Sequence, residues 1–416
     1  MIRSRILAAA AVVATAVLGA QTWHKAFRPG GNDLTSYLLS ARALWDGQSP
    51  YGLDTPFPYI YPLFLAFAIV PLAILPYGAA VIGWFAASVA ALGAILLGPT
   101  KLGTSEGGRR WTSGSAVAAA AAVLVTFNVI QNNLLNGQVN FFVVLCCLMS
   151  ISVGRVPPSP GTGRGGPVRD ANEITAGAWL GAAIALKLMP VLLVVYFLVR
   201  RQFRTILVAA ATALVLALAP SVLILSGSGA EVESGFSRIT AVHAEYARGL
   251  LMPMMTTPAG DAALTYSIAS VVQRVLGVGP ALWIEVLCAA AVLATIAAVD
   301  VRTWRRDGDD RAAAAYLAAI ILISPKSETH HLAFAIPAVG LCCAWLFEEG
   351  KRRVVRSPAV RARRSLGAGG AMLLSGVALL AAPFTGAAEG PTITAAMVLL
   401  IAAVMQLPTS CIRQRA

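Results

Sequence analysis

Apolar segments long enough, or nearly long enough, to cross a bilayer recur along the whole chain, and short basic loops separate them. Crossing a hydrocarbon core takes about 20 mostly apolar residues in a helix, which satisfies its backbone hydrogen bonds internally. Only 12% of the 416 residues are charged, roughly half the share of a soluble domain. The pattern predicts an all-α polytopic membrane protein, with residues 1–416 as a single integral membrane domain.

The apolar segments predict about twelve transmembrane helices, with both termini on one side of the membrane. Several segments are shorter than a full span, so these helices are expected to tilt or to be buried within the bundle. The expected spans are 6–22, 78–98, 115–132, 139–153, 174–187, 188–200, 205–225, 281–299, 311–325, 331–348, 366–383 and 392–407.

The distribution of basic residues orients this layout. Net charge is +13, but the Lys and Arg residues lie in short loops between apolar segments rather than on one phosphate-binding face. This is the positive-inside pattern of membrane proteins, and it argues against a nucleic-acid partner. With both termini cytoplasmic, all 32 basic residues fall on the cytoplasmic side except Lys25, Arg28, Arg42, Lys187, Arg238, Arg248, Arg274 and Lys326.

Two features leave alternatives open near the N-terminus. Residues 1–20 resemble a secretory signal, yet we expect an uncleaved first helix, because cleavage would remove the helix that positions Asp33. Residues 59–75 could form a crossing of their own if 174–199 were one helix. We favour a re-entrant or membrane-surface helix at 59–75 and a break at Lys187–Pro190. The alternative topology would place two basic loops on the outer side of the membrane, against the positive-inside rule.

This topology places the polar candidates on the outer side of a plasma membrane. The first outer loop, 23–77, carries Asp33 a few residues beyond the first helix, and a long outer loop covers 226–279. A carboxylate in water beside lipid suits a membrane enzyme, since a general base must reach the proton it abstracts. The structural alternative is that Asn32, Asp33 or Thr35 caps a helix over 34–45.

Two further segments carry polar groups where lipid penalises them. Six amide side chains lie within 131–140, and Asn136, Gln138 and Asn140 are candidates to bind a sugar or phosphate; interfacial capping is the alternative. Lys187 lies among apolar residues ahead of Pro190, where it could bind a phosphate at the membrane face or snorkel to the surface.

The fourth segment is SPKSETHH, residues 324–331, at an outer turn. Lys326, His330 and His331 suit anion recognition. A single histidine pair is weak evidence for zinc, which usually has three or four protein ligands.

In order along the chain, these segments resemble glycosyltransferase family 87. The first motif is D-x3-Y-x3-A-x-A-L-x2-G-x2-P-Y from Asp33, and Y-x-P-L from Tyr61 comes after it. The later motifs are N-G-Q-V-N, G-x5-K-x2-P and S-P-x4-H-H. Each motif alone is weak, and their order over residues 30–340 makes the resemblance specific. Met189 and Thr329 depart from it, since aromatic residues are common at both places in the family.

The resemblance implies a GT-C-type bundle whose first outer loop carries a catalytic acid. Asp33 would then be the general base for inverting transfer of a sugar, with mannose expected, from a polyprenyl-phosphate donor to a lipid or glycan acceptor. Lys187, His330, His331, Lys326, Asn136, Gln138, Asn140, Tyr37 and Tyr61 would bind the donor phosphate or substrate. We expect no cofactor and no obligatory metal.

Two alternatives stay open at this point. One is an arabinofuranosyltransferase that uses decaprenyl-phosphoryl arabinose, because related proteins share these motifs. The other, from a different class, is a lipid or sugar transporter or flippase. Transporters tend to show repeated halves and charges at the membrane midplane, whereas the polar residues of this chain gather at one face.

Overall fold

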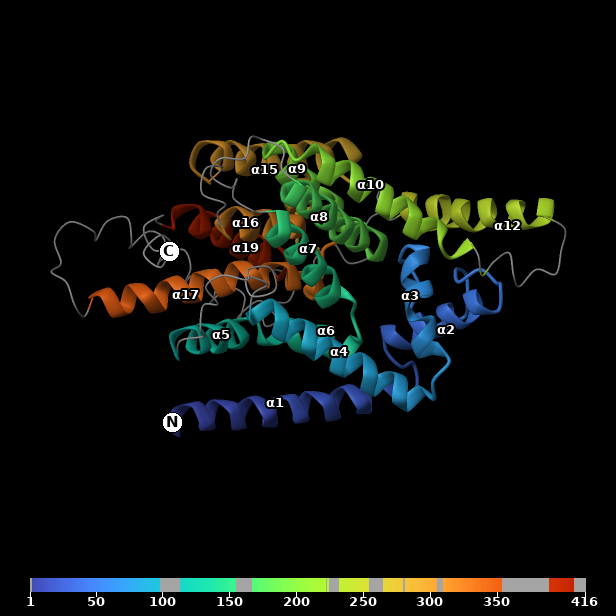
Figure 1. Cartoon of the computed structure of the whole chain (residues 1–416), viewed down its shortest axis with the longest axis horizontal. Coiled ribbons are helices and arrows are strands. Elements are labelled where there is room, and N and C mark those ends of the chain that lie inside the picture. The colour runs from blue at the N-terminus through green and yellow to red at the C-terminus, as the bar shows by residue number, and fades with distance from the viewer. Residues whose placement is uncertain are drawn as a thin grey trace. The chain divides into compact units, whose positions relative to one another are not determined.

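The computed structural model describes residues 2–97, 113–154, 167–221, 223, 232–253, 265–279, 281–304, 310–353 and 389–407, and every element in them is helical (Figure 1). The described chain divides into two compact units. The first contains residues 1–94, 131–191 and 203–254, and the second contains 95–130, 192–202 and 255–416. The expectation of an all-α protein is therefore met in the described residues.

The first unit begins with a long apolar helix and the amphipathic helix that comes after it. Its helices are α1 (Ile2–Ala26), α2 (Asp33–Trp45), α3 (Leu63–Ala73), α4 (Tyr77–Leu97, up to residue 94), α7 (Asn140–Gly154), α8 (Pro167–Leu186), α10 (Phe203–Leu218), α12 (Val232–Ala244) and the π-helix η3 (Glu245–Leu251). Helices α7, α8 and α10 run side by side (Figure 1). Together with α2 and α3 they form the packed part of this unit.

Close packing of α8 on α10 depends on two glycines four residues apart. A Cβ built on Gly177 would lie 2.6 Å from the Thr205 carbonyl oxygen, and one on Gly181 would lie 2.6 Å from that of Ala209. Small residues at this spacing let two membrane helices approach until their backbones touch.

The second unit centres on one helix that is buried along its whole length. It contains α5 (Ser113–Val125), the start of α6 (Phe127–Asn136), η2 (Met189–Leu193) from residue 192, α9 (Val194–Val199), α14 (Ile268–Leu276), α15 (Leu282–Val299), η5 (Asp300–Trp304), α16 (Asp310–Ile323), η6 (Thr329–Ala335), α17 (Ile336–Arg353) and α19 (Glu389–Gln406). Helix α16 packs against α15, α17, α19 and η6, and its residues from Arg311 to Ile323 are all buried.

Three helices of the described residues are long and apolar enough to cross a membrane: 77–96, 282–302 and 329–346; a bent pair, 117–125 with 127–136, makes a fourth. Large apolar side chains point outward, as on α15, where Trp283 and Leu287 are 63% and 60% exposed. Exposed apolar surface of this kind fits a lipid surround. The count of twelve spans stays a prediction, and its segment 366–383 lies outside the described residues.

Of three expectations about individual segments, the break at Lys187–Pro190 is met, the placement of 59–75 at the membrane stays a prediction, and the segment 115–132 is bent rather than continuous. Helix α8 ends before Lys187, and a 3₁₀ turn begins at Met189. Helix α3 has 11 residues, which at 1.5 Å each give about 17 Å, too short to cross a bilayer alone. The segment expected to span over 115–132 is bent: α5 and α6 meet at an angle of 69°. Thr126, at the bend, donates its hydroxyl to the Ala122 carbonyl, a contact that often bends helices.

Candidate functional site

Asp33 is the first residue of α2, and its neighbours fix the start of that helix. Asn32 is the N-cap, in a capping box with Thr35. The Asn32 side-chain amide also donates to the Leu135 carbonyl at 3.1 Å, which ties the cap to the amide-rich segment. The capping interpretation is confirmed for Asn32, and Asp33 lies half-buried in the first turn of the helix. The helix N-terminus there favours a negative charge.

The Asp33 carboxylate is contacted by Gln138, 105 residues further along the chain. The Gln138 side-chain amide donates to Asp33 Oδ2. The Tyr61 hydroxyl in turn donates to Gln138 Oε1 at 3.0 Å. Gln138 and Tyr61 are both buried, so three residues that the sequence motifs indicate separately form one hydrogen-bonded chain.

A cluster of buried aromatic rings surrounds this chain. Tyr37 packs edge-on against Tyr61 and Tyr59, with ring centroids 5.1 and 6.3 Å apart, and it also contacts Trp84 at 6.2 Å. Burial raises the pKa of Tyr37 well above its ordinary value. The Tyr37 hydroxyl therefore stays protonated at physiological pH, which excludes it as a general base.

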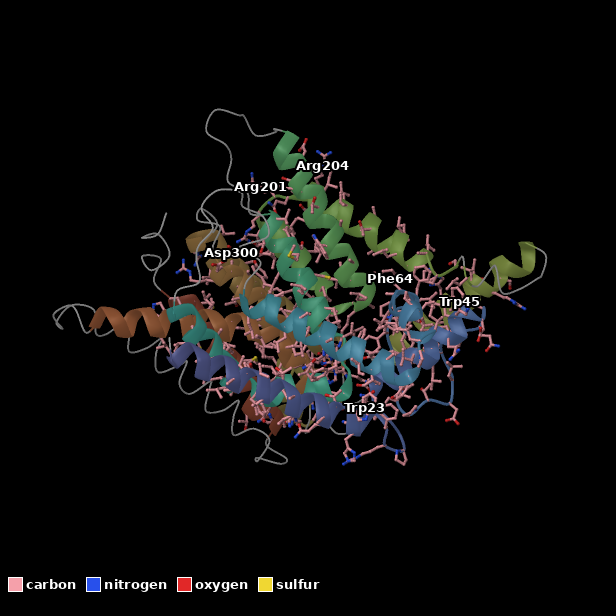
Figure 2. The ribbon with its side chains drawn as sticks, turned by 60° about the horizontal axis from the view of Figure 1, so that its bottom comes forward. Trp23, Trp45, Phe64, Arg201, Arg204 and Asp300 are labelled. Atoms are coloured by element: carbon pink, nitrogen blue, oxygen red, sulfur yellow. The ribbon has the colours of Figure 1, made fainter. Side chains whose placement is uncertain are left out.

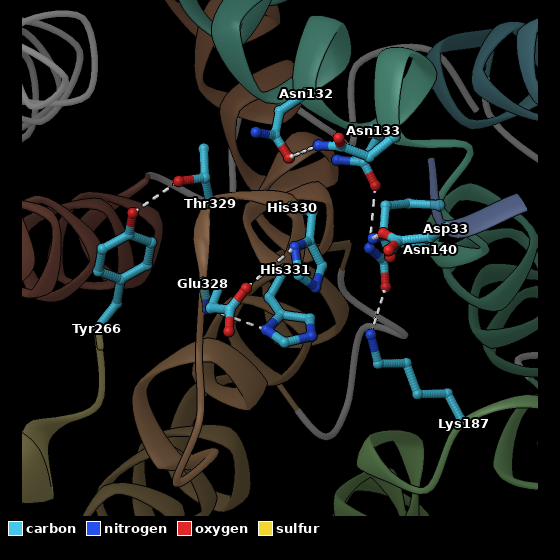
Figure 3. Close-up of polar contacts among 12 residues, drawn as sticks. Asp33, Asn132, Asn133, Asn140, Lys187, Tyr266, Glu328, Thr329, His330 and His331 are labelled. Atoms are coloured by element: carbon cyan, nitrogen blue, oxygen red, sulfur yellow. Dashed lines mark hydrogen bonds and ion pairs between the residues drawn. The ribbon is translucent and has the colours of Figure 1, made fainter. Parts of the chain in front are cut away.

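Lys187 is buried and belongs to the same unit. Its ammonium donates to Asn140 Oδ1 at 2.8 Å (Figure 3). It also lies 5.3 Å from the centroid of the Tyr61 ring. Asn140 also donates to Asn133 Oδ1 at 2.9 Å. A buried cation needs such partners. The sequence motifs do not point to Asn133, although it lies within the amide-rich segment.

Asn136 lies apart from Gln138 and Asn140 in its contacts. Lys25, in the last turn of α1, donates to Asn136 Oδ1, and the Asn136 amide donates to Asn132 at 3.1 Å. The contacts of Asn136 tie the end of α1 to the end of α6 rather than to Asp33.

The end of α1 also carries aromatic side chains of the kind found at membrane surfaces. Trp23 packs on Phe27 at 4.5 Å, and Phe27 packs edge-on against Tyr77 at 5.0 Å. Trp23 and, at the end of α2, Trp45 are 45% and 53% exposed (Figure 2). Tryptophan at such positions favours the membrane–water interface. The pattern suits a first outer loop that lies at the headgroup level.

In the second unit, residues 324–331 form a compact turn. The Ser327 hydroxyl donates to the carbonyls of Ile321 and Ser324, at 2.5 and 3.2 Å, and closes the end of α16. The backbone N–H of Glu328 donates to His331 Nδ1 at 3.0 Å, within a capping box (Figure 3). In the neutral imidazole the proton is then on Nε2, so His331 is set up as a donor.

His330 and Lys326 lie in the same turn. His330 Nδ1 is 3.6 Å from a Glu328 carboxylate oxygen, and the His330 and His331 rings are 4.1 Å apart. Thr329, where the resemblance expects an aromatic residue, shares a 2.7 Å hydrogen bond with the hydroxyl of Tyr266 (Figure 3). Tyr266 is fully buried, so an aromatic ring reaches this position from a distant segment.

The first unit thus brings together Asp33, Gln138, Tyr61, Lys187 and Asn140. This group pairs a partly exposed carboxylate with a buried cation, held on one scaffold of amides and aromatic rings. A carboxylate can accept a proton from a hydroxyl, and a cation can stabilise a departing anion. The arrangement suits transfer of a group from an anionic leaving group to a hydroxyl acceptor.

Comparison with solved structures gives ArnT from Cupriavidus metallidurans in two forms. The apo form has a TM-score of 0.41 at 14% identity and covers 96% of this chain and 77% of that one. The form bound to undecaprenyl phosphate has a TM-score of 0.44 at 15% identity, covering 95% and 76%. Scores this low do not establish a shared fold.

Curated proteins give closer similarity. Over 335 residues the chain is 29% identical to a polyprenol-phosphate-mannose-dependent alpha-(1-2)-phosphatidylinositol mannoside mannosyltransferase of Mycolicibacterium smegmatis, covering 74% of this chain and 68% of that protein. It is 26% identical to a polyprenol-phosphate-mannose-dependent alpha-(1-2)-phosphatidylinositol pentamannoside mannosyltransferase of Mycobacterium tuberculosis, covering 76% and 66%. The chain spans about two thirds of the length of each relative.

The sequence motifs and these two relatives agree with a match to a family model. The model of glycosyltransferase family 87 matches residues 59–325, well over half of the chain. The protein is therefore a glycosyltransferase that belongs to family 87.

Proposed function

We propose that the protein transfers mannose from a polyprenyl-phosphate donor to a hydroxyl group of a lipid-linked or cell-envelope glycan. The reaction would take place on the outer face of the plasma membrane. Both curated relatives are mannosyltransferases that depend on polyprenol-phosphate-mannose, which favours mannose over arabinose as the donor sugar. Family membership favours an enzyme over a transporter. The GT-C-type bundle of about twelve spans is part of this proposal.

Asp33 is the general base in this proposal. It accepts the acceptor hydroxyl proton while the acceptor oxygen forms a bond to the anomeric carbon. On the opposite side, the bond from that carbon to the phosphate oxygen breaks, and the polyprenyl phosphate leaves with the electron pair. This single displacement inverts the anomeric configuration. The observation that carries the assignment is the half-buried Asp33 carboxylate at the start of α2, in the loop beyond the first apolar helix.

The leaving phosphate gains negative charge as its bond to the sugar breaks. Lys187 is a buried cation in the same unit as Asp33, and it is fixed by Asn140 and the Tyr61 ring. A fixed charge stabilises a developing anion without reorganising first. We assign donor phosphate binding to Lys187, with Asn140 as the residue that orients it. Anion recognition by Lys326, His330 and His331 stays part of the proposal, as the family motif implies.

The test is sugar transfer by the purified protein in lipid vesicles, with radiolabelled polyprenyl-phosphate mannose and acceptor lipids extracted from an actinobacterial membrane. Asp33→Asn is expected to lower kcat at least about a hundredfold, the scale of lost general-base catalysis. Asp46→Asn is the matched control, because Asp46 is an exposed carboxylate at the other end of α2. Equal activity of the two variants would refute the assignment of the base.

Two further arms of the same assay address the donor. Lys187→Met is expected to raise the KM for the donor and lower kcat. The substitution removes the cation that binds the donor phosphate in the ground state and stabilises its developing charge in the transition state. The wild-type protein is also offered polyprenyl-phosphate arabinose. Transfer from that donor, with none from the mannose donor, would replace the proposed sugar.

A further inference from the structure

The backbone of the loop between α6 and α7 is held tightly around Gln138. Gly137 has φ of +65°, and its carbonyl accepts a hydrogen bond from the Trp84 indole at 2.9 Å. The backbone N–H of Gln138 donates to the Asn133 carbonyl at 2.9 Å. The Gln138 side chain, 3% exposed, therefore starts from a fixed point and extends toward α2.

The orientation of the Gln138 amide group is set by Tyr61. A glutamine side chain can present either its oxygen or its NH₂ group in a given direction. Because the Tyr61 hydroxyl donates to Gln138 Oε1 at 3.0 Å, the NH₂ group is the side that faces Asp33. The reversed amide would place an acceptor oxygen against the carboxylate and would also lose the hydrogen bond from Tyr61.

Tyr61 is itself held in place on both sides. Tyr37 packs against its ring, and its backbone carbonyl accepts a hydrogen bond from the Tyr51 hydroxyl at 3.1 Å. The side chains of Gln138 and Tyr61 thus both make hydrogen bonds to other side chains of the protein. Their geometry matches a support for Asp33 better than a sugar-binding surface, which was the sequence expectation for both residues.

We infer that Gln138 and Tyr61 are positioning residues, which hold Asp33 in the orientation that accepts the acceptor proton. The inference rests on the proposed role of Asp33 as the base. A hydrogen bond to the carboxylate from a pre-oriented donor fixes the carboxyl plane, and Tyr61 acts only through Gln138. The substrate then contacts other groups, and loss of either positioning residue leaves its binding intact.

The experiment measures kcat and KM for donor and acceptor in Gln138→Met and Tyr61→Phe. Gln138→Met keeps the shape and removes the donor, and Tyr61→Phe keeps the ring beside Lys187 and removes the hydroxyl. We expect kcat to fall about tenfold or more in Gln138→Met, the scale of a lost hydrogen bond to a charged group, and by a smaller factor in Tyr61→Phe, which loses a hydrogen bond to a neutral amide. Both KM values should be unchanged. The double variant should be no worse than Gln138→Met alone, because both substitutions break one chain of contacts.

Tyr59→Phe is the matched control for loss of a buried tyrosine hydroxyl. The Tyr59 hydroxyl donates to the Pro62 carbonyl at 2.9 Å and accepts from the Ala66 N–H at 2.8 Å, so its contacts start helix α3. Tyr59→Phe is expected to lower the melting temperature while leaving kcat within about twofold of wild type. A drop in kcat for Tyr61→Phe at a comparable melting temperature then reports positioning rather than general loss of structure.

Failures of the two proposals are distinguishable. If Asp33→Asn abolishes transfer while Gln138→Met and Tyr61→Phe behave like Tyr59→Phe, the positioning role is wrong and the base assignment stands. If either variant raises KM at unchanged kcat, the residue binds substrate directly and the inference is overturned. If Asp33→Asn keeps full activity, the assignment of Asp33 as the base in the proposed function is wrong, and the positioning role that rests on it is wrong as well.

Discussion

Substitution of Gly137 by alanine tests whether the loop after α6 supports the start of α2. An ideal Cβ on Gly137 would lie 2.7 Å from Leu34 Cβ and 3.3 Å from the Leu34 backbone nitrogen. Real Cβ atoms keep at least about 3.4 Å in ordinary contact, so Leu34 would have to move by several tenths of an ångström. Leu34 comes directly after Asp33, and the same displacement would therefore reach the carboxylate.

The magnitude has two parts. An alanine at φ of +65° costs about 1–2 kcal/mol relative to glycine, and forcing a methyl group into a filled space costs about 1–3 kcal/mol. Gly277 provides the control, because it also has φ of +65° and nothing lies within 4 Å of its Cβ position. Gly277→Ala should therefore lose only the first part, and Gly137→Ala about 2–5 kcal/mol in all.

The assay is unfolding by detergent titration in mixed micelles, together with sugar transfer on the same preparations. Because small errors in the placement of a catalytic group are costly, Gly137→Ala should also lower kcat about tenfold or more, whereas Gly277→Ala should not. The reasoning is refuted if the two variants lose the same stability. It is also refuted if Gly137→Ala keeps wild-type kcat.

The remaining predictions concern charged residues close in sequence to the start of α10, together with Asp300 (Figure 2). Asp300 is fully buried and pairs with Arg200 at 2.5 and 3.0 Å. Asp300→Asn should cost roughly 3 kcal/mol in the free energy of unfolding, because it leaves a cation that is only 11% exposed without its counter-charge. Arg204→Gln is the control, because it breaks a pair with Asp170 in which both side chains are 48% exposed. It should cost less than about 0.5 kcal/mol in the free energy of unfolding. Equal losses of melting temperature in Asp300→Asn and Arg204→Gln would contradict the argument. Arg201 is exposed, with φ of +56°; Arg201→Gly should therefore stabilise the protein by roughly 1 kcal/mol, and a lower melting temperature would contradict it.

The sequence was sufficient for the local features of the site. A cap residue before Asp33 and the amphipathic pattern after it predict helix α2, because capping depends on residues within one turn. The break at Lys187–Pro190 is consistent with Pro190, which has no N–H to donate to the helical backbone. The order of short motifs along the chain was also enough to predict the family.

Tertiary structure decided which of these residues work together. The sequence motifs indicate Gln138 and Tyr61 separately, and the fold links them, with Tyr61 donating to Gln138 and Gln138 donating to Asp33. The bend between α5 and α6 was missed because a run of apolar residues carries no signal for direction. The contact of Asn133 with Asn140 could not be predicted from the sequence, because only the packing of the helices shows which of several amide side chains hydrogen-bonds to Asn140. Propensity and capping act within a turn of helix, whereas contacts between residues a hundred positions apart depend on how whole helices pack.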